Sequence, residues 1–144
     1  MRGRLYRSFR KDLATARIDL LADTLKVLLV GAEYVFDPGH QRRSDVRGEA
    51  QGRGYQEGGR ELTGKVIEFD AEDVMVLRAD GLLWAPATVA AVGAVLYKSR
   101  GREPFDDELI EWFPFDEPRG VLNGALRIDW AGGVVLRSSE RAEE

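Results

Sequence analysis

The chain has 144 residues and a mass of 16.1 kDa, with 44% hydrophobic and 32% charged residues. This length suits one domain over 1–144 that buries a sizeable core without cross-links. The absence of cysteine excludes a disulfide framework and a thiolate metal site, and a single histidine argues against a histidine-rich metal site. No apolar run approaches the roughly 20 residues of a membrane span, and none resembles a signal peptide. We therefore expect a soluble protein, made in the cytoplasm and not embedded in a membrane.

The basic residues are concentrated in the first part of the chain. Residues 1–60 carry 12 basic and 8 acidic side chains, whereas residues 61–144 carry 9 and 17, which gives an overall charge of −4. The cations that precede the first acid, Asp12, are Arg2, Arg4, Arg7, Arg10 and Lys11. Such asymmetry indicates either a solvated helix face or an arm that docks on an acidic partner. In an assembly of identical copies, the arm would also be able to dock on the acidic residues 61–144 of a neighbouring copy.

The first predicted element is an amphipathic helix over 5–17, within a basic N-terminal arm over 1–17. Its apolar stripe, at spacings of four, four and three residues, comprises Leu5, Phe9, Leu13 and Ala16. A turn over 19–24 then leads to a run of leucine and valine over 25–30, which Gly31 ends. This run predicts a buried strand.

Residues 37–61 are rich in glycine and arginine and are predicted to form a long loop. Six glycines interrupt this polar stretch, and only Val46 and Tyr55 are expected to anchor it. A short helix over 41–46 is compatible with the pattern. A loop of this length in a small domain is usually either functional or disordered. The glycine spacing matches no phosphate-binding motif, so a nucleotide site is not favoured.

The body over 62–136 reads as a succession of short strands separated by turn signals. The expected strands are 66–69, 74–77, 82–84, 88–97, 109–113, 125–130 and 134–136. Roughly seven or eight short strands are typical of an antiparallel sandwich, a jelly roll or a small barrel. We predict a mainly β, antiparallel sandwich or jelly-roll-like domain with a short N-terminal amphipathic helix. A polar tail over 137–144 completes the chain.

No arrangement of residues predicts catalysis, a cofactor or a metal site. His40 lies in a loop with no partner nucleophile, so we interpret it as structural or exposed. Acids cluster at 106–108 and at 70–73, but the spacing matches no calcium loop, and we interpret both as surface turns. The large aromatic residues near the strands are Tyr6, Trp84, Tyr97, Trp112, Phe113, Phe115 and Trp130. Because acids accompany them, an aromatic core is favoured over a nucleic-acid surface.

A series of short motifs occurs in a fixed order along most of the chain. They are IDLLADTLKVLLV at 18–30, SDV at 44–46, GYQEGG at 54–59, WAPATV at 84–89, AVLYK at 94–98, LI at 109–110, NGALRIDW at 123–130 and GVVL at 133–136. Together, over about residues 5–136, they resemble a family of small virion structural proteins of tailed bacteriophages. The chain differs from that family in having fewer acids at 79–83 and a more basic arm and loop, which affects surfaces more than the fold.

The resemblance implies a non-enzymatic structural component of a phage particle. We expect a capsid decoration, or cement, protein that binds the outer capsid and stabilises the joints between capsomers. A minor tail, neck or fibre-associated protein is the alternative, and a glycan-binding module or a particle-borne hydrolase is less favoured. The expected partners are the major capsid protein, other virion proteins and further copies of the chain.

The expected contact elements are the basic arm, the Gly/Arg-rich loop and the tail. Glycine allows close backbone approach, and arginine makes planar paired contacts to carboxylates. The candidate interface residues are Arg2, Arg4, Tyr6, Arg7, Arg10, Lys11, Arg42, Arg43, Arg53, Tyr55 and Arg60.

Overall fold

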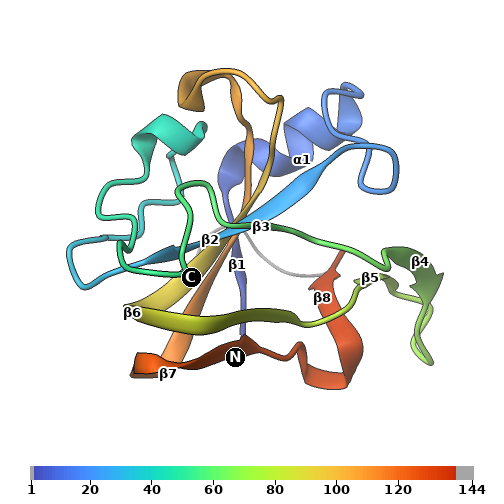
Figure 1. The fold of residues 1–144 in the computed structure, drawn as a ribbon. Helices are drawn as coiled ribbons and strands as arrows, with labels where there is room; N and C mark the ends of the chain where they lie inside the picture. Colours follow the sequence, from blue (N-terminus) through green and yellow to red (C-terminus); the bar gives the residue numbers. More distant parts are fainter. Residues whose placement is uncertain (1, 139–144) are drawn as a thin grey trace.

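The computed structural model describes residues 2–138 as a mainly β protein with two antiparallel sheets and one α-helix (Figure 1). This confirms the mainly β, antiparallel part of the predicted fold class. The larger sheet has the strand order β1–β7–β6–β2–β3, and the smaller has the order β4–β5–β8. The bounds are β1 Arg4–Leu5, α1 Arg7–Ala14, β2 Leu25–Val30, β3 Arg60–Glu61, β4 Val66–Phe69, β5 Met75–Arg78, β6 Leu82–Lys98, β7 Leu109–Ile128 and β8 Val134–Arg137. Three short 3-10 turns cover Arg43–Asp45, Pro104–Asp106 and Ala131–Gly133.

Strands β6 and β7 form one long antiparallel hairpin, which bends through the larger sheet (Figure 1). Their pairing starts at Leu82 and Ile128 and continues through several register shifts, one of them around Pro86. Irregular pairing of this kind tolerates proline and glycine inside a strand, so neither Pro86 nor Gly93 ends β6. The expected strands at 82–84 and 88–97 are therefore one strand, as are those at 109–113 and 125–130.

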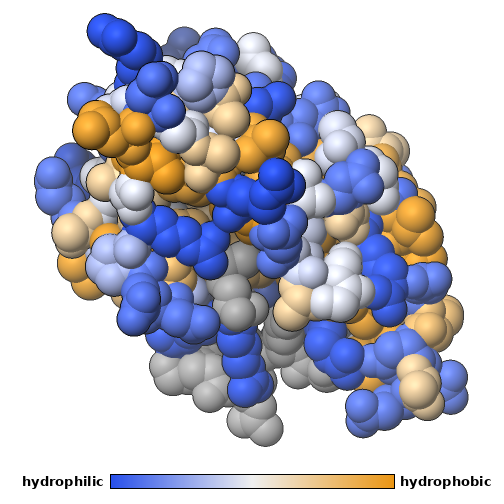
Figure 2. All heavy atoms as spheres, turned by 60° about the horizontal axis from the view of Figure 1, so that its bottom comes forward, coloured by the Kyte–Doolittle hydropathy of each residue, from blue (hydrophilic) through white to orange (hydrophobic). Residues whose placement is uncertain are grey.

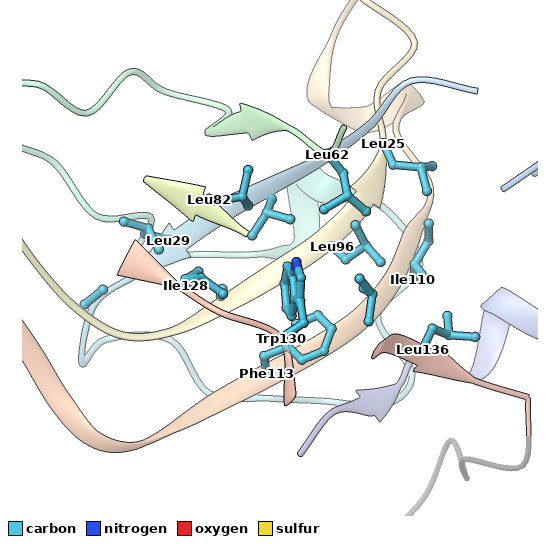
Figure 3. Close-up of a cluster of buried hydrophobic side chains, with 14 of the residues drawn as sticks. Leu25, Leu29, Leu62, Leu82, Leu96, Ile110, Phe113, Ile128, Trp130 and Leu136 are labelled. Atoms are coloured by element: carbon cyan, nitrogen blue, oxygen red, sulfur yellow. The ribbon is translucent and has the colours of Figure 1, made fainter. Parts of the chain in front are cut away.

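Strand β2 is buried on both of its faces, which explains its unbroken apolar sequence. Alternate residues of β2 enter different clusters: Leu25, Val27 and Leu29 join the main core, whereas Leu28 and Val30 join a second cluster. The main core also contains Leu77 of β5 and Leu136 of β8, so both sheets bury side chains in it. Figure 3 shows Leu25, Leu29 and Leu136 converging with Ile110, Phe113, Ile128 and Trp130.

Helix α1 is shorter than predicted because residues 4–5 belong to β1, which pairs with β7. The helix ends in a Schellman motif: the Ala16 N–H donates to the Leu13 carbonyl (3.3 Å) and the Arg17 N–H to the Asp12 carbonyl (2.8 Å). Ala16 has φ 63°, the left-handed conformation that this motif needs at its C′ residue. The predicted helix over 5–17 is thus corrected at both ends.

The apolar stripe predicted for the helix is only partly buried. Leu5 and Phe9 are buried, whereas Leu13 is 36% exposed and Ala16 is exposed. Leu13 instead borders an apolar hollow of about 240 Å³ between α1 and the smaller sheet. The second buried helix residue is Asp12.

The Gly/Arg-rich loop lies against the larger sheet of its own chain. The Ala50 N–H donates to the Leu29 carbonyl (2.8 Å), and Arg53 bridges to Thr88. At Gly59, a β-carbon would collide with the backbone of β2, so glycine is needed for this close approach. The possible helix at 41–46 is a 3-10 turn over Arg43–Asp45, and the loop ends in β3. Of the predicted tail, Arg137 ends β8, and 139–144 lie outside the described residues.

Candidate docking site

Two tyrosines predicted as interface residues lie inside the fold. Tyr6 is fully buried, and its hydroxyl is 2.5 Å from that of Tyr34. Tyr55 is also buried; its hydroxyl donates to Glu49 Oε2 (2.5 Å) and accepts the N–H of Leu29 (2.9 Å). Burial raises the pKa of both Tyr6 and Tyr55. These tyrosines stabilise the interior, which corrects their assignment as surface contacts.

The predicted cations divide into residues engaged by the fold and residues on the surface. The Arg43 side chain is 14% exposed, and its Nε donates to Asp107 Oδ2 (2.9 Å). Arg4 is half-buried, with its guanidinium 4.6 Å from the ring centroid of Phe36. Arg42 is half-buried as well, and the exposed cations are Arg2, Arg7, Arg10, Lys11, Arg53 and Arg60. Arg43 is therefore primarily a structural residue.

Cations from the arm and the loop come together in one hollow beside α1. We call this the basic hollow; it has a volume of about 440 Å³. It is lined by Arg7, Ser8, Lys11, Asp12, Arg17, Gly39, Gln41 and Arg42. Arg53 and Arg60, which were also predicted, do not line it, and Arg60 instead donates to the Leu83 carbonyl (2.7 Å).

Three of the lining residues were predicted as contacts, but Ser8, Asp12 and Arg17 were not. The sequence signal for the first two is the helical spacing: 7 and 11 are four residues apart, and so are 8 and 12. Side chains at this spacing are neighbours on a helix. Arg17 lies beyond α1 and reaches the hollow where the Schellman motif turns the chain.

Hydrogen bonds hold the two sides of the basic hollow in place. The N–H of Arg7 donates to the Pro38 carbonyl (2.9 Å), which ties the start of α1 to the loop. Asp45 Oδ2 accepts the N–H groups of Gln41 (2.9 Å) and Arg42 (3.1 Å). These bonds, the first of them above all, keep the pKa of Asp45 below its usual value despite partial burial. The lining backbone is therefore ordered before any partner arrives.

Asp12 is the unusual member of the lining. Asp12 is only 5% exposed, and its Oδ2 has no hydrogen-bond partner. The hydroxyl oxygen of Ser8 is also buried and has no hydrogen-bond partner. Loss of hydration raises the pKa of Asp12, while the charges of Arg42, Arg17 and Lys11 act against that rise and Glu108 adds to it. The lining of the hollow thus combines cations that attract an anion with two buried oxygens that have no hydrogen-bond partner.

A larger hollow of about 760 Å³ lies beside the Gly/Arg-rich loop and is lined by three glutamates and Tyr55. Of these acids, Glu49 already accepts hydrogen bonds from Tyr55 and from the N–H of Gly58 (2.7 Å). No predicted cation lines this hollow. It is therefore the weaker candidate for the contacts that the sequence indicates.

The acids at 106–108 are not a solvated turn, which corrects that interpretation. Asp107 and Glu108 are each 1% exposed; Asp107 pairs with Arg43, and Glu108 with Arg100 Nη2 (2.7 Å). His40 is half-buried, and Asp70 accepts N–H bonds in the turn before β5. Within residues 2–138, no three histidine or acidic side chains are grouped to hold a metal ion.

The predicted aromatic core is confirmed, because all seven of those aromatic residues are at most 8% exposed. The exposed large hydrophobic residues include Val66 (50%) and Phe69 (70%) on edge strand β4, and also Leu122 and Val35 outside it. The face shown in Figure 2 is mostly hydrophilic. It carries hydrophobic side chains on the right, the side on which β4 lies in Figure 1. Among the described residues, no helix has the length and apolar character needed to cross a membrane.

No family model, curated protein or solved structure matches the chain.

Proposed function

We propose that this protein is a non-enzymatic structural protein of a tailed-bacteriophage particle, and specifically a capsid decoration protein. The proposal starts from the series of sequence motifs whose order along the chain resembles that of small virion proteins. The observation that carries it further is the basic hollow, in which cations from two distant segments line one ordered surface. Such a surface suits docking on an acidic protein partner, for which we propose the major capsid protein at the capsid exterior.

The mechanism that we propose is physical rather than chemical. A packaged capsid is loaded from inside by compressed DNA, and a protein that spans neighbouring capsomers opposes their separation. An interface of standard size removes roughly 1,600 Å² from water. Because the lattice repeats the same site many times, even modest contacts give high avidity when copies are linked. Self-association fits this scheme, and the exposed apolar residues of edge strand β4 support a second copy as its partner there.

The proposal includes a sandwich or jelly-roll-like arrangement with an amphipathic helix. Its support is the common core, to which Leu77 and Leu136 of the smaller sheet and Leu25 of the larger sheet contribute. For the helix, Phe9 is buried while Arg7, Arg10 and Lys11 are exposed. The helix would then present its cations to the partner.

The experiment that tests the proposal is the copy number of the protein in purified particles. Quantitative mass spectrometry would compare it with the major capsid protein. A ratio near one, or a simple fraction set by the capsid lattice, supports decoration. A few copies per particle would assign the protein to the neck, tail or a fibre, and absence from particles would reject a virion role.

A variant pair links the copy number to the surface. Arg42→Ala removes a cation that lines the basic hollow, whereas Arg53→Ala removes an exposed cation outside it. We expect Arg42→Ala to lower occupancy on particles and to increase DNA leakage on heating. Arg53→Ala is expected to behave like the unmodified protein.

A further inference from the structure

We infer that the basic hollow binds an acidic peptide segment through the carboxylates of that segment and also through its backbone N–H groups. This inference deepens the proposed function and rests on it for the identity of the partner. Arg7, Lys11, Arg17 and Arg42 would contact the carboxylates. Ser8 and Asp12, whose unpartnered oxygens are buried in the lining, would turn toward the ligand and accept the N–H groups.

The cations alone explain why the ligand is an anion. Four of them line a hollow of about 440 Å³ that holds one acid, so its formal charge is strongly positive. Guanidinium groups match carboxylates with paired, charge-assisted hydrogen bonds. This positive charge contrasts with the rest of the chain, since residues 61–144 carry 17 acidic and 9 basic side chains.

Asp12 explains why the ligand must also carry hydrogen-bond donors. A simple anion in the hollow would approach a carboxylate that is 5% exposed, and the two like charges would repel. A ligand N–H group would be attracted to Asp12 instead, because it donates a hydrogen bond to Oδ2. This oxygen is otherwise buried without a partner. Ser8, one helical turn before Asp12, adds a second acceptor on the same face.

An acidic peptide supplies both features in the same residues. Every residue of an extended segment has one N–H donor close to its side-chain carboxylate. A phosphodiester chain has its negative charge on groups without donors, and the acidic body of this protein would repel a long polyanion. The combination therefore favours a short acidic stretch of protein over a nucleic acid.

The test uses the full chain and two matched peptides. One is an acetylated tetraglutamate amide, and the other is the same peptide with methylated backbone nitrogens, which keeps the charge and removes the donors. Calorimetry would measure both affinities. We expect the methylated peptide to bind at least about tenfold more weakly, because a hydrogen bond to a charged group contributes about 1.5–3 kcal/mol.

Substitution of Asp12 separates recognition from a folding defect. In Asp12→Ala, the preference between the peptides should fall towards one, and the methylated peptide should bind more tightly than it binds the unmodified protein. A misfolded variant would not gain affinity. Arg42→Ala should weaken both peptides by similar factors, and Arg53→Ala should change neither.

Three results would overturn the inference. These are equal affinity for the two peptides, unchanged preference in Asp12→Ala, and tighter Arg42-dependent binding of a single-stranded oligonucleotide of equal charge. If the peptides fail to bind but the protein occupies capsids stoichiometrically, the inference fails and the proposed function stands. If the peptides bind as expected but the protein is absent from particles, the proposed function fails and the peptide site stands.

Discussion

Replacing Tyr55 with phenylalanine tests whether this residue anchors the Gly/Arg-rich loop to the sheet. The substitution keeps the ring, whose centroid lies 6.0 Å from that of Trp84, and removes only the hydroxyl. That hydroxyl accepts the N–H of Leu29 in β2 and donates to Glu49 of the loop. One oxygen therefore joins the loop to the central strand.

The expected loss in the free energy of unfolding is about 2–4 kcal/mol. Leu29 is fully buried, so its N–H would lose its partner where water does not reach, at a cost of about 1–3 kcal/mol. The loss at Glu49 is smaller, about 1 kcal/mol, because its Oε2 still accepts the N–H of Gly58 at 2.7 Å. Such a loss is a large share of the 5–15 kcal/mol that stabilises a typical domain.

The assay is denaturant unfolding combined with amide hydrogen exchange. We expect a lower midpoint with an unchanged slope, and faster exchange at Leu29. Tyr97→Phe is the matched control, because it removes a single hydroxyl bond, to the carbonyl of the buried Gly58 (2.6 Å), and should cost about 1–3 kcal/mol without changing exchange at Leu29. The reasoning is refuted if Tyr55→Phe costs less than the control or leaves exchange at Leu29 unchanged.

Three further substitutions address the helix end, the hairpin and a buried ion pair. Ala16→Gly relieves the left-handed backbone of the Schellman motif and should raise unfolding free energy by about 0.5–1 kcal/mol. Gly93→Ala places a methyl group against the Trp112 ring and should lower it by about 1–3 kcal/mol in the same assay. Burial opposes ionisation of Glu108, but its hydrogen bonds to Arg100 and the charge of that residue outweigh it and keep the pKa of Glu108 below its usual value. The stability from this pair is present at neutral pH and is lost as pH falls through the lowered pKa. Unfolding free energy should therefore drop more steeply between about pH 5 and pH 3 in the unmodified protein than in Glu108→Gln.

Each of these three predictions has an outcome that would contradict it. Destabilisation by Ala16→Gly would mean that glycine entropy in the unfolded chain outweighs the strain. A neutral Gly93→Ala would show that the Trp112 ring moves aside freely. Parallel acid profiles for the unmodified protein and Glu108→Gln would mean that other carboxylates dominate acid unfolding.

Local sequence patterns were sufficient for several elements. The apolar run at 25–30 followed by Gly31 predicted β2, and the runs at 66–69 and 134–136 predicted β4 and most of β8. The mainly β, antiparallel class also followed from short apolar runs and turn residues. These features were predictable because strand formation and turn chemistry depend mostly on residues that are neighbours in the chain.

Only the tertiary structure decided how those elements join and which surface they form. The break around Pro86 predicted separate strands at 82–84 and 88–97, but pairing with β7 carries β6 through this position. The stripe through Leu13 predicted a buried face, whereas Leu13 is exposed and Asp12 is buried. Tyr55 was predicted as a contact residue, but its hydroxyl is hydrogen-bonded to Leu29 of β2 inside the fold. The basic hollow depends on the approach of residues 7–17 and 39–42, and such long-range proximity is set by packing, which no local pattern encodes.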